Sequence, residues 1–365
     1  GPMRGMALLI VFFISAGCGG EPQLFIDLER PSGALDPLKD KRLSKFSLRL
    51  VQGKQTTTQE AFRGGDTELA VGTVPVDSPF DLRLAGRSAS GLMVGLGQVL
   101  DLTVSDSQIT RISIKFRKPL GYVTGPNQVQ TLDAASTTSG QLELNPLPIS
   151  GGTGVAAMRN GVVLLVTSGA TLVPIRTSDH TKLTPLKLSS TGSCVGVSRD
   201  NRRALICHPQ ARTVGVVDLA AIGTPQARES TLSVGGTPSK VVFSRDRRRA
   251  LVLLNAKSPR AACTGASSQV VEVDLPSGKA SAPKSLGAPV ADIALDPRDE
   301  SLLLVLPCKN KLRLSTNGVK VQEVDIPATH DLAASDQNFV LVGRASGATA
   351  KGQAVLFALT KGSGL

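Results

Sequence analysis

Short runs in which apolar and polar residues alternate fill the first third of the chain. Residues 46–50 (Phe-Ser-Leu-Arg-Leu), 80–84 (Phe-Asp-Leu-Arg-Leu) and 112–116 (Ile-Ser-Ile-Lys-Phe) all follow a period of two. This period predicts antiparallel strands that bury one face and wet the other. About seven such strands between residues 23 and 115 predict an immunoglobulin-like or transthyretin-like β-sandwich. The Pro-, Lys- and Asp-rich residues 32–43 are expected to form a loop.

After Pro119 the pattern becomes a repeat. The segment PSKVVFSRDRRRALV at residues 238–252 is echoed by CVGVSRDNRRALI at 194–206 and by PVADIALDPRDESLLL at 289–304. Repeats of roughly 40–50 residues with four short strands are typical of β-propeller blades, so the chain is predicted to be all-β, with a six-bladed propeller at residues 116–361. The predicted units are 116–150, 151–190, 191–234, 235–286, 287–327 and 328–361.

A propeller has to close its ring to protect the edges of its sheets. The last unit ends one strand short, so we expect residues 99–105 or 109–116 to supply its missing outer strand. The alternative is a seven-bladed propeller, with one more blade in residues 85–118.

The repeat also carries residues of a known family. Residues 122–125 (Tyr-Val-Thr-Gly), followed by 129–133 (Val-Gln-Thr-Leu-Asp), resemble the YVTN family of β-propellers. The resemblance implies the propeller fold. It also permits a lactonase-type hydrolase with a metal in the central channel, for which Asp292 and His330 are candidate ligands, although these residue types do not repeat around the ring.

The N-terminus has the three parts of an export signal: one basic residue, an apolar run over residues 6–14 and small residues before a cysteine. Residues 15–18 (Ser-Ala-Gly-Cys) resemble the lipobox of bacterial lipoproteins, which implies that Cys18 is lipidated and anchors the chain to a membrane. Residues 1–17 would then be a tag remnant and signal peptide, and residues 18–22 a lipidated tether. Gly19 after the cysteine implies the outer membrane of a bacterial cell envelope, on its periplasmic or its surface side.

The charge is strongly basic, with 41 Lys and Arg against 29 Asp and Glu, and stays at +11 if Arg4 leaves with the signal. Such a balance favours anionic partners. In an envelope these are anionic lipids, lipopolysaccharide and acidic proteins. Nucleic acid is not expected as a partner, because one Tyr and no Trp leave few platforms on which bases could stack.

Four cysteines follow Cys18, and an exported chain can oxidise them. If Ser198 faces Arg203 across a turn, the same register places Cys194 opposite Cys207, where a non-hydrogen-bonded pair brings the side chains close. Cys263 and Cys308 remain as the second predicted pair. The repeat alignment places Cys308 in the loop that corresponds to the long Cys263 loop of the preceding unit. The sequence contains no Cys-x-x-Cys spacing, so the cysteines do not indicate a zinc site or redox chemistry.

Arginines cluster at equivalent turns of three units. By analogy with other propellers these turns share one face, where arginine could bind phosphate or carboxylate groups. The alternative is a solvated polar turn. The candidate patch comprises Arg199, Arg202, Arg203, Arg245, Arg247, Arg248, Arg249 and Arg298.

No residue is nominated as catalytic, and no cofactor or metal is expected. His180, His208 and His330 lie in different units without an acidic or cysteine partner at ligand spacing, so each is interpreted as a lone surface histidine. The predicted function is a non-catalytic envelope lipoprotein that binds or scaffolds protein partners through its propeller. Besides the hydrolase, a structural or adhesive surface component is the alternative.

Overall fold

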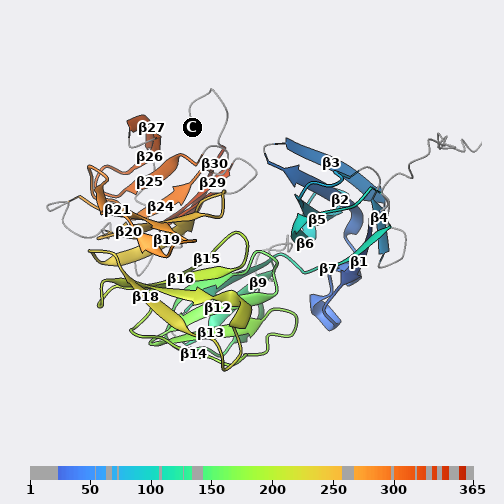
Figure 1. Cartoon of the computed structure of the whole chain (residues 1–365), viewed down its shortest axis with the longest axis horizontal. Helices are drawn as coiled ribbons and strands as arrows, with labels where there is room; N and C mark the ends of the chain where they lie inside the picture. The colour runs from blue at the N-terminus through green and yellow to red at the C-terminus, as the bar shows by residue number, and fades with distance from the viewer. Residues whose placement is uncertain are drawn as a thin grey trace, which may run out of the picture. The chain divides into compact units, whose positions relative to one another are not determined.

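The computed structural model is almost entirely β (Figure 1). Within the described residues, its helical elements are three 3₁₀ turns, at Gly33–Leu35, Pro37–Lys39 and Leu219–Ala221. None of the helices in the described part of the chain is long and apolar enough to span a bilayer. The structure describes residues 24–53, 55–62, 68–71, 74–106, 109–125, 127–133, 143–256, 267–296, 300–316, 319–325, 331–334, 339–344 and 353–358.

The chain divides into two compact units with a boundary at Phe116, and residues 31–39 group with the second. The first unit has a sheet in the order β4-β1-β7 and a sheet in the order β3-β2-β5-β6. The strands are β1 (Leu24–Glu29), β2 (Leu43–Gln52), β3 (Gln55–Phe62), β4 (Glu68–Val71), β5 (Phe80–Ser88), β6 (Met93–Leu102) and β7 (Thr110–Lys115).

The alternating apolar residues of these strands form the core of a sandwich, as the period of two predicts. Phe46, Leu48, Leu82 and Leu84 on one sheet are buried, as are Leu24, Ile26 and Ile114 on the other. The ring of Phe46 lies 5.6 Å from that of Phe116, centroid to centroid. A side chain at Gly97 would collide with Ile114, so this glycine lets the two sheets approach. The fold class is therefore confirmed for this unit.

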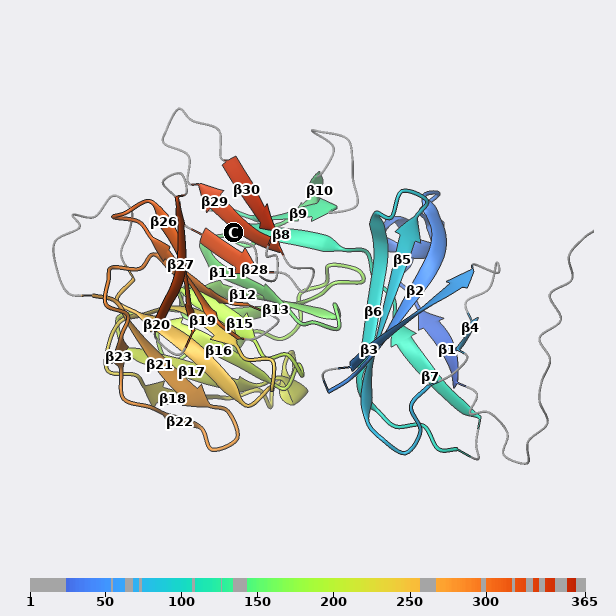
Figure 2. The same cartoon turned by 90° about the horizontal axis from the view of Figure 1, so that it is seen from above.

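In its described residues, the second unit has six successive sheets, which run from blue-green to red along the chain in Figures 1 and 2. Each falls within one predicted repeat unit. Sheet 1 consists of β8 (Leu120–Thr124), β9 (Val129–Asp133) and β10 (Glu143–Leu147). Sheet 2 consists of β11 (Gly152–Ala157), β12 (Val163–Ser168), β13 (Thr171–Arg176) and β14 (Leu186–Lys187). Sheet 3 consists of β15 (Cys194–Val197), β16 (Arg203–His208), β17 (Thr213–Asp218) and β18 (Glu229–Ser233).

Sheets 4 to 6 follow the same order. Sheet 4 consists of β19 (Pro238–Phe243), β20 (Arg249–Leu254), β21 (Gln269–Asp274), β22 (Lys279–Ala280) and β23 (Lys284–Ser285). Sheet 5 consists of β24 (Asp292–Leu295), β25 (Leu302–Leu306), β26 (Lys311–Thr316) and β27 (Val319–Asp325). Sheet 6 consists of β28 (Asp331–Ala334), β29 (Phe339–Arg344) and β30 (Gln353–Ala358).

Adjacent sheets pack through their apolar faces. The first strand of each sheet contacts the first strand of the next, from β8 through β11, β15, β19 and β24 to β28. Leu165 and Leu172 of sheet 2 share a core with Ile206 of sheet 3, and Leu253 of sheet 4 packs with Leu304 of sheet 5. Small sheets that stack side by side in this way are the blades of a β-propeller.

The predicted closure of the ring is wrong. Residues 93–102 form β6 and pair with β5, and residues 110–115 form β7 and pair in parallel with β1. The physical reason is burial: Ile114 and Phe116 fill the sandwich core and are fully buried there. The same pairings place residues 93–115 outside the propeller, so they do not form a seventh blade.

Candidate functional site

The turn that joins the first two strands is built in the same way in blades 3 and 4. The Ser198 hydroxyl accepts a hydrogen bond from Arg203 N and donates one to Asp200, whose carboxylate accepts Arg202 N. Ser244 and Asp246 make the equivalent bonds in blade 4. The fourth residue of each turn, Asn201 or Arg247, has a positive φ. Glycine adopts a positive φ freely, and Asn tolerates it better than Arg does.

The side chain of a residue with positive φ connects the turns of neighbouring blades through a hydrogen bond. The side-chain oxygen of Asn201 accepts a hydrogen bond of 2.6 Å from the backbone N–H of Arg159 in blade 2. The carboxylate of Glu300 in blade 5, which also has a positive φ, accepts one from the backbone N–H of Arg245 in blade 4. Each bond satisfies a loop N–H and fixes the spacing between adjacent blades.

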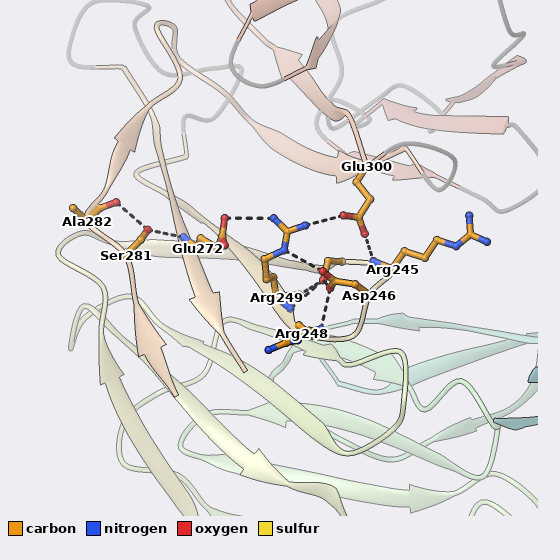
Figure 3. A network of polar contacts seen from close by, with 9 residues as sticks. Arg245, Asp246, Arg248, Arg249, Glu272, Ser281, Ala282 and Glu300 are labelled. Atoms are coloured by element: carbon orange, nitrogen blue, oxygen red, sulfur yellow. Dashed lines mark hydrogen bonds and ion pairs between the residues drawn. The ribbon is translucent and has the colours of Figure 1, made fainter. Parts of the chain in front are cut away.

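Arg249 is the centre of a charged network between blades 4 and 5 (Figure 3). Its guanidinium lies 3.0 Å from Glu300, 3.3 Å from Asp246 and 3.8 Å from Glu272. Burial acts to raise the pKa of Asp246, but hydrogen bonds from Ser244 and Arg248 N and the charge of Arg249 outweigh it and lower that pKa. Three carboxylates therefore compensate one cation, which leaves Arg249 poorly suited to binding an external anion.

The arginine patch is thus not a uniform cationic surface. Arg249 is engaged by carboxylates, and Arg203 lies 3.4 Å from Asp218. Arg202, Arg245 and Arg248 are exposed, whereas Arg199 and Arg247 are half-buried. Arg298 lies outside the described residues. Anion binding by the remaining members stays a prediction.

A cleft of about 710 Å³ opens beside this network, between blades 4 and 5. Leu251 and Val270 of blade 4 and Leu302 and Leu304 of blade 5 form its apolar floor. Its charged wall consists of Arg249, Glu272, Lys284, Glu300 and Arg313. Sequence reasoning missed this cleft because its walls come from separate repeats.

Most of the charges in the cleft compensate one another. Arg313 lies 2.8 Å from Glu323, and both side chains are largely buried. Arg249 holds Glu272 and Glu300 as described above. The ammonium of Lys284 forms no ion pair within the described part of the chain, and its residue is exposed. An apolar floor with an uncompensated cation at its edge can receive a ligand that carries both an apolar and an acidic group.

The two candidate metal ligands of the lactonase hypothesis are not brought together by the described structure. Asp292 on β24 is buried and its carboxylate lies 3.0 Å from the ammonium of Lys240 on β19. His330 lies outside the described residues. Among the residues that are described, no three His, Cys, Asp or Glu side chains are grouped so that they could hold a metal ion.

The predicted Cys194–Cys207 disulfide is present. The two residues face each other in the β15–β16 register, with Cα atoms 5.0 Å apart. Cys308 is also disulfide-bonded. Its predicted partner Cys263 lies outside the described residues, as does Cys18, so the second pairing and the lipidation stay predictions.

The lone-histidine interpretation is wrong for His208. Its side chain is fully buried, and Nε2 lies 2.6 Å from the Glu229 carboxylate. The other oxygen of Glu229 accepts a 2.6 Å hydrogen bond from Ser189 N in the connection from blade 2. The two residues are 21 positions apart in the sequence, so their spacing did not predict the pair. They meet because β16 and β18 lie on either side of β17 in the sheet.

The His208–Glu229 pair is electrostatically stabilised. Burial acts to lower the pKa of His208, but the hydrogen bond and charge of Glu229 outweigh it, so this pKa is raised. Burial conversely acts to raise the pKa of Glu229, and the bonds from His208 and Ser189 bring it below its ordinary value. His180 differs: burial lowers its pKa, and its ring contacts the Tyr122 hydroxyl at 3.5 Å.

No protein-family model matches the sequence, and no curated protein matches it. Solved structures do resemble the fold. A chain of Kuenenia stuttgartiensis hydrazine synthase is similar with a TM-score of 0.52 at 14% identity, over 79% of this chain and 98% of that one.

Two further structures show weaker likeness. The Cps50 (Swd1) β-propeller domain of Myceliophteria thermophila has a TM-score of 0.48 at 10% identity, over 67% of this chain and 81% of that one. The dihydro-heme d1 dehydrogenase NirN in complex with DHE has a TM-score of 0.42 at 16% identity, over 62% of this chain and 49% of that one. Together, the blade topology and the hydrazine synthase likeness define this chain as a β-propeller protein. At this identity the likeness concerns the fold alone.

Proposed function

We propose that this chain is a cell-envelope lipoprotein that binds partner proteins, without catalysis, through the cleft between blades 4 and 5. The observation that carries the proposal is the cleft itself, in which an apolar floor lies beside the uncompensated ammonium of Lys284. Binding sites are favoured where loops and strand ends are held by a rigid scaffold. The occupant we propose is an extended segment of an envelope protein that brings an acidic side chain to Lys284 and an apolar one to the floor.

The size and setting of the cleft support this role. Its volume of about 710 Å³ falls in the range of pockets that enclose a ligand. The ion pairs of Arg249 and Arg313 hold its walls in place. An occupant therefore meets a preorganised surface, which reduces the entropic cost of binding.

A photo-crosslinking residue tests the cleft in cells. We would place it at position 285, which lines the cleft beside Lys284 and keeps that ammonium, and as a matched control at Lys279, an exposed residue of blade 4 that does not line the cleft. The intact lipoprotein with the probe at 285 is expected to capture a discrete partner that the control does not. Identical products from both positions would contradict the proposed docking site.

The anchor rests on residues 15–18, which resemble a lipobox. Mass spectrometry of the mature chain is expected to show acyl chains on Cys18, and Cys18→Ser is expected to release the protein from the membrane fraction. An unmodified Cys18 in membrane-bound protein would contradict lipid anchoring.

A further inference from the structure

We infer that two copies of this chain pair through the free edge of β3, so that their β3-β2-β5-β6 sheets join across a two-fold axis. The partner at this edge is a second copy of the chain, and the surface belongs to the first unit. The inference goes beyond the proposed role of the cleft, which belongs to the propeller, and does not depend on it.

β3 is a long and regular edge strand. It is the outer strand of its four-stranded sheet (Figure 1) and pairs with β2 over its eight residues without a β-bulge. Residues 55–58 are all exposed. An edge of this kind presents a row of backbone N–H and C=O groups to any strand that can pair with them.

Proteins commonly protect such edges with proline, lysine, bulges or short strands. In the described part of the chain, the edge strand β10 contains Pro146, and β14, β22 and β23 are two residues long. β6, at the opposite edge of the same sheet, pairs with β5 through two register shifts. β3 has none of these features, since it reads Gln-Thr-Thr-Thr-Gln-Glu-Ala-Phe in one continuous register. Its edge is therefore suited to pairing.

The geometry of the β2–β3 hairpin determines which backbone groups face outward. Gln52 and Gln55 are register partners on either side of a two-residue turn, so their backbone groups bond to each other. The direction of these groups alternates along a strand, so those of Thr57 point to β2 and those of Thr56 and Thr58 point to the free edge. An added strand would therefore bond to Thr56 and Thr58.

The sequence of this edge matches itself in the antiparallel direction. Residues 55–59 read Gln-Thr-Thr-Thr-Gln, a palindrome centred on Thr57. With Thr57 on the two-fold axis, Thr56 of one copy is opposite Thr58 of the other, and the backbone groups of both face the other copy. Facing threonines favour the pairing of strands. The edge thus fits a second copy of itself, as an isologous interface requires.

The charges next to the palindrome also favour a second copy. The register centred on Thr57 assigns Glu60 of one copy to position 54 of the other, which is Lys54 in the sequence. Opposite charges at facing positions stabilise paired strands. The symmetry produces this match on both sides of the axis. Lys54 itself lies outside the described residues.

Analytical ultracentrifugation of the chain from residue 18 with Cys18→Ser tests the pairing. We expect a concentration-dependent equilibrium between monomer and dimer. Thr57→Lys sets like charges opposite each other on the axis and should raise the dimer dissociation constant by about fivefold. Thr57→Glu should have the same effect for the same reason. An equimolar mixture of the two variants should dimerise about as tightly as the parent protein, because the facing charges are then opposite.

The matched control is Thr231→Lys, a change at another exposed threonine on an edge strand, β18. It should change the dissociation constant by less than about twofold. A parent protein that stays monomeric at every concentration would overturn the inference. So would a mixture of the Thr57→Lys and Thr57→Glu variants that associates no more tightly than either variant alone.

A cysteine provides a second measurement of the register. Thr57→Cys should give a disulfide-linked dimer on mild oxidation, because a facing pair without mutual backbone bonds brings its side chains close. Thr58→Cys should give much less, since the residue that faces it is Thr56 of the other copy. Non-reducing electrophoresis compares the two, and equal cross-linking would contradict a two-fold axis at Thr57.

Discussion

His208 and Glu229 form a buried ion pair whose nitrogen and oxygen lie 2.6 Å apart, although 21 residues separate them in the chain. The pair lies on the face of β17, between the two strands that flank it. Through Ser189 N it also ties blade 3 to the connection from blade 2. It is therefore both a bond within one blade and a link between two.

Replacing His208 by Ala should lower the free energy of unfolding by about 3 kcal/mol, because it leaves the Glu229 carboxylate buried without its partner. Chemical denaturation at pH 7 measures the loss. The double variant with Glu229→Gln should recover part of it, since the buried charge is then gone. A loss below 1 kcal/mol would show that the pair is not coupled to folding.

The pair also predicts a pH dependence. The pKa of His208 is raised, so its contribution is complete below the unfolded pKa of about 6.5 and is lost as the pH rises through the folded pKa. The pKa of Glu229 is lowered, so its contribution is lost as the pH falls through that pKa. Melting temperatures across pH 3 to 9 should show both losses, and His208→Gln should remove the one at high pH.

The His208–Glu229 pair requires a glycine at position 215, which has no Cβ. A Cβ at this position would overlap the Glu229 carboxylate and lie 2.8 Å from His208 Nε2. Gly215→Ala should therefore destabilise the protein by about 1–3 kcal/mol, the usual cost of overpacking. In a Glu229→Ala background the same change should cost less, because the overlapping group is absent. Thermal unfolding of the four variants gives this coupling, and additive effects would argue against it.

Arg249→Gln should weaken the contact between blades 4 and 5. The variant leaves Asp246, Glu272 and Glu300 without their shared cation, and we expect a loss of about 1 kcal/mol because the network is partly exposed to solvent. Urea denaturation measures it, and raising the salt concentration should reduce the difference from the parent protein. Arg202→Gln, an exposed turn residue of blade 3, should have no measurable effect.

Removing the Cys194–Cys207 disulfide with a double Ser variant should lower stability by about 2–3 kcal/mol, the value for a closed loop of this size. Denaturation with and without reductant measures the effect.

Non-reducing peptide mapping tests the second predicted pair, where a Cys263–Cys308 peptide is expected. A peptide that links Cys308 to another cysteine would correct the assignment.

The sequence by itself determined the local and periodic features of this protein. The alternation at residues 46–50 set the sandwich strands, because a period of two buries one face of a sheet. The repeated SRD turn set the blades, and its Ser198–Arg203 register placed Cys194 opposite Cys207. These inferences hold because each depends on residues close together in the chain.

Only the tertiary structure decided which distant residues meet. Ile114 and Phe116 could have formed an outer propeller strand, but the sandwich core buries them completely. The partner of His208, the compensation of Arg249 and the cleft beside Lys284 all arise where separate strands or blades face each other. Such contacts depend on packing across the sheets, and no spacing along the chain encodes them.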